Sequence, residues 1–138
     1  MQARTAKIYI LGANYLQNAD WHSDAQLMKT IISFYTKAKA FEELSGFYDA
    51  CAQVEIDEYR EYEKAIGAMK EALKHLLKSN AIDKDNKVLN LQTRIQIIND
   101  FVNARNLTQT NPQEMLRICT NILQIVSIFW AFFIFGFL

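Results

Sequence analysis

Residues 57–79, DEYREYEKAIGAMKEALKHLLKS, decide the fold class of this chain. Apolar side chains recur in this stretch at alternating steps of three and four, which is the spacing of one face of an α-helix. Most helices of proteins are stable only when another element covers such a face. The stretch therefore predicts a long helix that packs against a second helix. The apolar positions are Tyr59, Tyr62, Ile66, Met69, Leu73 and Leu76.

A second stretch with the same spacing follows the polar turn SNAIDKD, residues 79–85. It extends over about residues 86–105, and two helices with matching faces and a short connection favour an antiparallel helical hairpin. We therefore predict that the helices of residues 57–79 and 86–105 pair. The apolar positions of the second helix are Val88, Leu91, Ile95, Ile98 and Val102.

Four further helices are indicated by similar patterns and by capping residues. We expect them at about residues 6–19, from Ser23 to about residue 39, at residues 40–54, and from Pro112 onward. Ser23 followed by Gln26 is typical of a capping box, in which side chains bind the free amides at a helix start. Asn111 before Pro112 likewise indicates the start of a helix, and we expect Glu114 to complete the capping box there. The first helix carries Ile8, Leu11, Tyr15 and Leu16 on one face.

The sequence therefore predicts an all-α fold of about six helices, arranged as antiparallel pairs of an α-solenoid. Ala65, Met69 and Ala72 fit part of the tetratricopeptide repeat pattern, with methionine in the place of phenylalanine. The other half of that pattern is absent at the required offsets. We expect a tetratricopeptide-like fragment over residues 1–121, followed by an apolar segment over residues 122–138.

Composition and charge exclude several classes of function. Fifteen basic and fifteen acidic side chains cancel, so the chain has no net field to hold a nucleic acid. The two cysteines, Cys51 and Cys119, have no metal-binding or redox spacing, which favours a reducing cytoplasm. There is no glycine-rich phosphate loop and no tetrahedral set of metal ligands. We expect no nucleic acid, no small-molecule substrate, no metal and no cofactor.

Cys51 raises the question of catalysis, because a thiol beside aromatic residues can be a nucleophile. A nucleophile needs a base within reach and a lowered thiol pKa. His22 and His75 are the two histidines; His75 is interpreted as a solvated position on a helix face and His22 as a residue of a connection beside Trp21, and neither is expected to be catalytic. Cys51 is better explained as a small residue between closely packed helices. We predict no enzyme activity, and we name Phe47, Tyr48, Cys51, Tyr59 and Tyr62 as candidate packing or partner-groove residues.

The final segment, ILQIVSIFWAFFIFGFL at residues 122–138, has no charged residue and allows three interpretations. Its seventeen residues would reach about 25 Å as a helix, near the lower limit for crossing a bilayer. It could be a membrane anchor, a helix buried in the domain, or an extension of the gene model into noncoding sequence. The first interpretation gives an alternative function, a tail-anchored membrane protein with a cytosolic helical interaction domain.

The run from Phe34 to Ala68, FYTKAKAFEELSGFYDACAQVEIDEYREYEKAIGA, resembles a known family. It is similar to the C-terminal tetratricopeptide-like region of the intraflagellar transport protein 140 family, a core subunit of intraflagellar transport complex A. GFYDACAQVEIDEY, residues 46–59, is the most specific part. Weaker similarity extends through ANYLQNADW, residues 13–21, and NPQEMLRICTNIL, residues 111–123.

The resemblance implies a non-enzymatic scaffold that acts in retrograde ciliary transport and in cilium assembly. Its expected partners are other subunits of complex A, and its expected location is the cytoplasmic side of the cilium and the ciliary base. Members of the family have a long N-terminal part with β-propellers, so we expect this chain to be a fragment of such a subunit. The similarity ends near Leu123, where the apolar segment begins.

Overall fold

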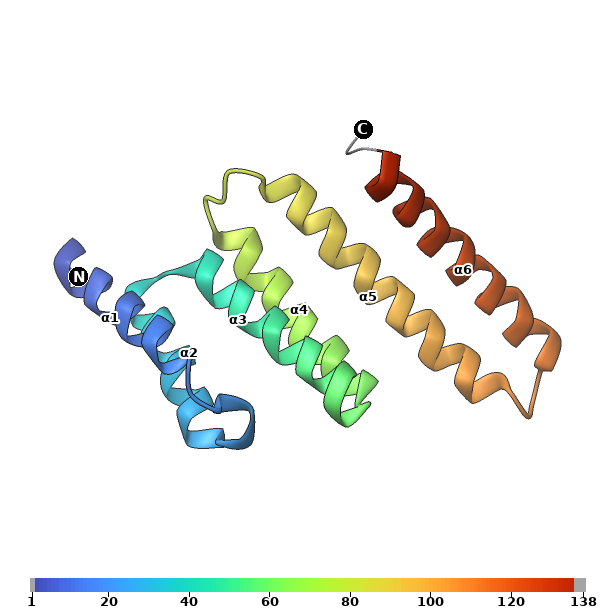
Figure 1. The fold of residues 1–138 in the computed structure, drawn as a ribbon, viewed down its shortest axis with the longest axis horizontal. Coiled ribbons are helices and arrows are strands. Elements are labelled where there is room, and N and C mark those ends of the chain that lie inside the picture. Colours follow the sequence, from blue (N-terminus) through green and yellow to red (C-terminus); the bar gives the residue numbers. More distant parts are fainter. Residues whose placement is uncertain (1, 136–138) are drawn as a thin grey trace. The chain divides into compact units, whose positions relative to one another are not determined.

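A computed structural model of the chain describes the backbone of residues 2–135 and the side chains of residues 2–128. In that part of the chain every regular element is helical, and six α-helices occur in succession (Figure 1). The predicted all-α, solenoid-like fold is therefore confirmed. The elements are α1 Ala3–Leu16, η1 Trp21–Ser23, α2 Ala25–Ala38, α3 Phe41–Val54, η2 Glu55–Tyr59, α4 Tyr62–Lys78, α5 Lys84–Leu107 and α6 Pro112–Phe135.

The chain divides into two compact units, residues 1–92 and 93–138. The first unit contains α1 to α4 and the start of α5, and the second contains the rest of α5 and α6. The division predicted between residues 121 and 122 remains a prediction, because the side chains from residue 129 onward lie outside the described residues.

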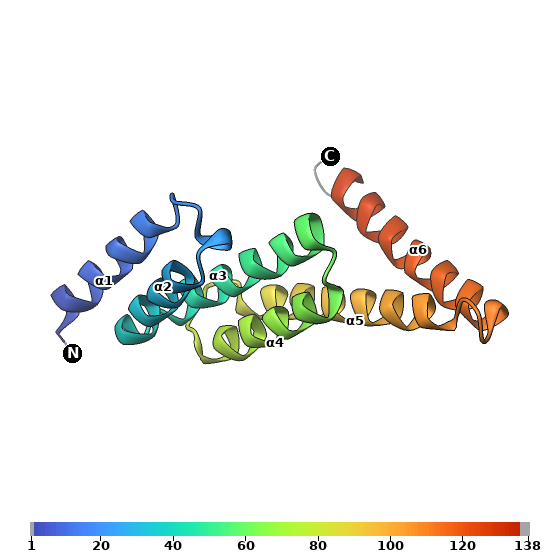
Figure 2. The same ribbon diagram turned by 90° about the horizontal axis from the view of Figure 1, so that it is seen from below.

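Helices α1 and α2 form the first pair, with a turn between them (Figure 2). Ala13 of α1 and Ile31 of α2 are fully buried. Tyr35, which is 1% exposed, donates a hydrogen bond from its hydroxyl to Asn14 Oδ1 at 2.6 Å. The hydroxyl also accepts a hydrogen bond from Gln17 Nε2. Both partners lie on or directly after α1, so a buried polar group on α2 fixes the position of the neighbouring helix.

Trp21, in the turn η1, covers the core between the first pair and α3. Its ring is 9% exposed and contacts Phe47 edge-on, with 4.9 Å between the ring centroids. Phe47 and Leu44 of α3 are each 1% exposed and belong to the same core cluster as Tyr35. A residue in a connection thus joins two helical layers.

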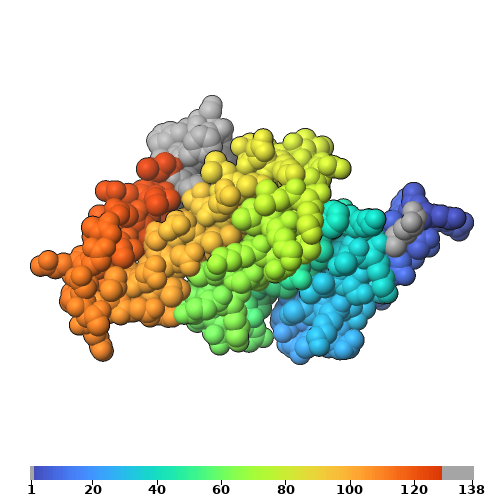
Figure 3. All heavy atoms as spheres, turned by 180° about the vertical axis from the view of Figure 1, so that it is seen from behind, coloured from blue at the N-terminus to red at the C-terminus, as the bar shows by residue number. Residues whose placement is uncertain are grey.

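Helices α3 and α4 form the second pair, and small residues line the contact between them. Ala52 on α3 and Ala65 and Ala72 on α4 are fully buried. The Ser45 hydroxyl donates to the backbone carbonyl of Ala72 at 2.8 Å, which requires a close approach of the two helices. In the space-filling view, atoms of α3 and α4 form a continuous surface in the cyan to yellow-green part of the chain (Figure 3).

The apolar face predicted over residues 57–79 is therefore covered by α3 within the first unit. Ile66, Met69 and Leu76 are buried, as the spacing predicted, and Leu73 is half-buried. The predicted pairing with residues 86–105 remains a prediction, because most of that helix belongs to the second unit.

The start predicted for the fourth helix is wrong. Residues Glu55–Tyr59 continue from α3 as a π-helical turn, and Arg60 then adopts a left-handed conformation with φ 57°. Helix α4 begins only at Tyr62, so Asp57 and Glu58 do not lie at its N-terminus. The apolar spacing continues through this break, which is why the pattern did not reveal it.

The predicted cap of α2 needs correction, whereas the predicted cap of α6 is confirmed. The residue that caps α2 is Asp24 rather than Ser23, because its carboxylate accepts from the backbone amides of Gln26 and Leu27 at 2.9 and 3.0 Å. Asn111 caps α6 as predicted, accepting from the Glu114 amide at 3.2 Å.

Glu114 does not complete the predicted box at the start of α6. Its carboxylate binds Arg117, one helical turn later. The backbone amide of Asn111, which Glu114 was predicted to bind, donates instead to the carbonyl of Leu107.

The face predicted for the first helix points largely to solvent. Ile8, Leu11 and Tyr15 are 60%, 58% and 76% exposed, whereas Leu16 packs against the core cluster. Ile10, which lies on a different face of α1 from these three residues, packs against the core cluster. The spacing thus identified an apolar face that α2 does not cover.

The apolar segment forms the last part of α6 as far as Phe135. Leu123 and Ile128 are 66% and 68% exposed, which does not fit a helix buried in the domain. Among the described residues, no helix has both the length and the apolar character needed to cross a bilayer. The tail anchor predicted over residues 122–138 falls largely on side chains that lie outside the described residues.

Candidate functional site

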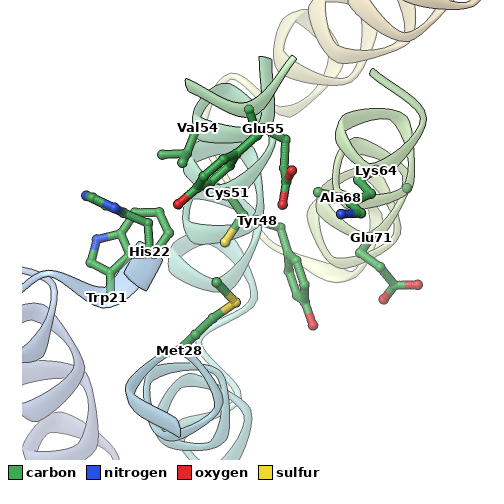
Figure 4. Close-up of a pocket in the computed structure, with 12 residues that line it drawn as sticks. Trp21, His22, Met28, Tyr48, Cys51, Val54, Glu55, Lys64, Ala68 and Glu71 are labelled. Carbon is green, nitrogen blue, oxygen red and sulfur yellow. The ribbon is translucent and has the colours of Figure 1, made fainter. Parts of the chain in front are cut away.

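The first unit contains an open groove of about 270 Å³ that crosses one face of α3 (Figure 4). On one side the groove is lined by Trp21 and His22 of η1 and by Met28 of α2. On the other side it is lined by α4. Its volume is just below the usual range of pockets that bind small molecules. It has room for one or two apolar side chains.

The floor of the groove is formed by the last two turns of α3. Tyr48, Cys51 and Val54 follow one another at steps of three residues, so they lie along one face of this helix. Glu55 continues the line at the start of η2. Figure 4 shows the sulfur atom of Cys51 between the side that carries Met28 and the side that carries Ala68. The floor is therefore an apolar strip that ends at a carboxylate.

The wall on α4 is low in the middle and charged at both ends. Gly67 and Ala68 lie between Lys64 and Glu71, so this part of the wall has almost no side chains. A Cβ atom added to Gly67 would meet no atom within 4 Å. The backbone of α4 is thus directly accessible from the groove. Tyr59, which is 50% exposed, lines the end of the groove near η2.

The structure brings three of the five candidate residues together and leaves two outside the groove. Tyr48, Cys51 and Tyr59 line it. Phe47 is not part of the lining; it is buried in the core beneath the groove, where it contacts Trp21. Tyr62 is half-buried at the start of α4 and is not part of the lining. The sequence could not separate these roles, because all five positions fit helical apolar faces.

Cys51 lies in an environment that opposes nucleophilic chemistry. Its side chain is half-buried, and burial, with a smaller contribution from the charge of Glu55, raises the pKa of the thiol to about 12. The thiol is therefore protonated at neutral pH, whereas a nucleophilic cysteine needs a lowered pKa. Within the groove it acts as a small apolar surface. Among the described residues, no group of three potential metal ligands occurs.

Two of the three charged residues that line the groove already have ion-pair partners. Lys64 lies 3.5 Å from Glu61, and Glu71 lies 3.2 Å from Lys74. The Glu55 carboxylate has no ion pair of this kind within the described part of the chain. One negative charge at the groove is thus left without a partner.

His75 is not a solvated residue, which corrects the interpretation from sequence. Its side chain is 15% exposed and lies between the rings of Phe41 and Tyr48 on α3. The ring centroids are 6.3 Å and 5.5 Å away, and the planes are nearly parallel. Nε2 lies 3.7 Å from a Glu71 oxygen, and the buried Nδ1 has no hydrogen-bond partner among the described residues. His75 thus stacks on Tyr48, a residue of the groove floor.

Burial is the main cause that lowers the pKa of His75; the negative charge of Glu71 opposes it, and the positive charges of Lys74 and Lys78 act with it. We expect His75→Phe to raise the free energy of unfolding by about 1 kcal/mol at pH 7.5. The reason is that phenylalanine keeps the stacking and removes a buried, unpaired nitrogen.

The same substitution should reduce the pH dependence of stability. Because the folded pKa is lowered, the unfolded chain binds more protons near and below its own pKa of about 6.5. The free energy of unfolding of the wild type therefore falls as the pH drops from 7.5 to 5.5, and the advantage of the variant grows. Urea unfolding at several pH values measures this. Parallel curves for the two proteins would contradict the assignment of the effect to His75.

The sequence analysis named only three of the twelve residues that line the groove, and Trp21 and His22 are among those it did not name as candidates. Both lie in a connection without periodicity, where apolar spacing carries no information. His22 Nδ1 lies 3.0 Å from Asp20 Oδ1, so the turn holds its own histidine in place. The sequence WHSD does carry one signal, a tryptophan three residues before the cap Asp24, because a large aromatic side chain in a connection gains stability when it covers a core.

Comparison with known protein families agrees with this architecture. Residues 42–128 match the family model of the C-terminal TPR domain of intraflagellar transport protein 140, and residues 1–34 match the model of the TPR domain of intraflagellar transport proteins 140 and 172. The groove combines both matched segments, with Trp21, His22 and Met28 in the first and its other lining residues in the second. The resemblance found over residues 34–68 is confirmed. Since the C-terminal domain model covers more than half of the chain, the chain belongs to the family of C-terminal TPR domains of intraflagellar transport protein 140.

Proposed function

We propose that this chain is a non-enzymatic scaffold, part of a subunit of intraflagellar transport complex A. It holds other subunits of that complex and acts in retrograde ciliary transport and cilium assembly, on the cytoplasmic side of the cilium and at its base. The observation that carries this proposal is the match of residues 42–128 to the C-terminal TPR domain of intraflagellar transport protein 140. Domains of this type bind other proteins through the faces of stacked helix pairs.

The chemistry of the groove supports an interaction role over a catalytic one. Its one thiol, Cys51, has a raised pKa of about 12. His22 is held by Asp20, and His75 is turned toward Phe41 and Tyr48. An apolar floor with an accessible helix backbone on one side is better suited to receive side chains of another protein.

Co-purification tests the proposal. The tagged chain is expressed in ciliated cells, and complex A subunits are quantified by mass spectrometry. We expect them to be enriched several-fold over a control of similar size, an unrelated tetratricopeptide repeat protein with the same tag. Lys70→Asp, on the exposed side of α4, serves as a folded surface variant and should behave like the wild type. Equal recovery with the chain and the unrelated repeat protein would reject the assignment to complex A.

A further inference from the structure

The groove over α3 has features that its own packing does not explain. Gly67 is an exposed residue in the interior of α4, where glycine is destabilising relative to alanine. The space around its missing side chain is empty, so no contact within the described chain requires glycine here. Gly12 differs, because a Cβ at that position would lie 3.1 Å from the Phe34 ring. Gly46 on α3 also has open space around it but does not line the groove, so among the described glycines Gly67 is the one at which a group in the groove can approach a helix backbone closely.

The charged residues at the groove indicate which charge the approaching group should carry. Glu55 ends the apolar floor and has no ion-pair partner among the described residues, whereas Lys64 and Glu71 are already paired. The adjoining segment of residues 55–63, EIDEYREYE, contains five acidic side chains and one basic side chain. This segment therefore carries a net charge of −4, although the whole chain is neutral. A ligand that fits the groove therefore presents a positive charge next to an apolar group.

The shape of the floor indicates the form of the ligand. Tyr48 and Cys51 of α3 and Glu55 at the start of η2 lie at steps of three and four, so the strip runs parallel to α3 for about 10 Å. A strip of two turns between two walls is the form of site that receives the apolar face of an amphipathic helix. The wall at Gly67 is low enough to let the backbone of such a helix come near α4.

We propose that the groove binds an amphipathic helix of a partner protein. An aliphatic side chain of that helix enters between Met28 and Cys51, and a lysine or arginine one turn away pairs with Glu55. This inference rests on the proposed function and deepens it, because it names the chemistry of one partner. Burial of an aliphatic anchor supplies the affinity, and the ion pair selects basic over acidic partners.

The test uses the full chain with Trp130→Phe, which leaves Trp21 as the single tryptophan and places the fluorescent reporter in the groove. Three 14-residue amphipathic peptides serve as probes. The first has leucines on one face and lysines on the other, the second replaces the lysines by glutamates, and the third replaces the leucines by alanines. We expect the first to change the Trp21 emission saturably, with a Kd about tenfold lower than that of either other peptide.

Variants with matched controls test whether the peptide binds in the groove. Glu55→Lys should weaken the leucine–lysine peptide about tenfold and strengthen the leucine–glutamate peptide, whereas Glu58→Lys, an exposed position of the same turn outside the lining, should change either affinity less than about twofold. Gly67→Leu should block the groove, and Gly67→Ala should keep the fold but weaken the leucine–lysine peptide several-fold, because the added Cβ occupies the space through which the ligand approaches the backbone. Circular dichroism confirms that each variant is folded.

Several results would overturn the proposal. They are the absence of a saturable Trp21 response, equal affinity for the lysine and glutamate peptides, or equal effects of Glu55→Lys and Glu58→Lys. Co-purification distinguishes a failure of the groove proposal from a failure of the function proposed above. If complex A subunits are recovered but no peptide enters the groove, the groove assignment alone fails. If the peptide binds as expected but no subunit is recovered, the assignment to complex A alone fails.

Discussion

Phe47→Ala is expected to lower the free energy of unfolding by about 3–5 kcal/mol, the range for removing a large aromatic side chain from a core. Phe47 is 1% exposed and contacts the Trp21 ring at 4.9 Å between centroids. The loss therefore includes burial, an aromatic contact and a cavity that the turn η1 cannot easily fill. Because a domain has only about 5–15 kcal/mol of stability, this is a large fraction of the total.

Urea unfolding measured by circular dichroism and by tryptophan fluorescence tests this expectation. Tyr15→Ala is the matched control, since it removes an aromatic side chain of similar size that is 76% exposed. That variant should change the free energy of unfolding by less than about 0.5 kcal/mol. Similar losses in the two variants would show that Phe47 does not occupy the core between η1, α2 and α3.

Met69→Asp is expected to have an effect of at least the same size, because it places a charge at a fully buried position between α3 and α4. An unpaired buried carboxylate costs several kcal/mol or becomes protonated, and in both cases stability is lost. The contact between these helices is tight, as the hydrogen bond from Ser45 to the Ala72 carbonyl shows. We expect the first unit to lose its cooperative unfolding transition.

Lys70→Asp provides the control, because the neighbouring residue has the same backbone environment and is exposed. It should cost less than about 0.5 kcal/mol, apart from a small effect of charge on the helix. The pair of variants tests the register of α4 directly. If both substitutions unfolded the protein, or neither did, the assignment of Met69 to the covered face would be wrong.

The sequence predicted the helices well because their apolar spacing is a direct consequence of helix geometry. The face of α4 that contains Ile66, Met69 and Leu76 was predicted from this spacing alone, and these residues are buried. The spacing of apolar residues does not show which neighbouring helix covers an apolar face, or whether any helix does. Ile8, Leu11 and Tyr15 form an equally regular stripe on α1, yet they are exposed. Only the arrangement of α1 against α2 separates the two cases.

Local backbone changes also escaped prediction. The π-helical turn at Glu55–Tyr59 and the left-handed Arg60 lie inside a continuous apolar pattern, and the energetic preferences of single residues are too small to reveal them. This break moves Tyr59 away from the face of α4 and places it at the groove. His75 was taken as solvated because charged residues surround it in sequence, whereas two rings from α3 enclose it in space. Whether such a side chain is buried depends on contacts between helices, which the local sequence pattern does not show.

The alanine-lined seam between α3 and α4 has a consequence for how variants of this domain are interpreted. Because Ala52, Ala65 and Ala72 are fully buried and the helices touch through them, a single added methyl group there would force the two axes apart. Tyr48 and Cys51 would then shift relative to Ala68, although none of these side chains had been altered. Inherited or engineered changes at the seam can thus act as recognition mutations as well as destabilising ones, and binding has to be measured beside the melting temperature.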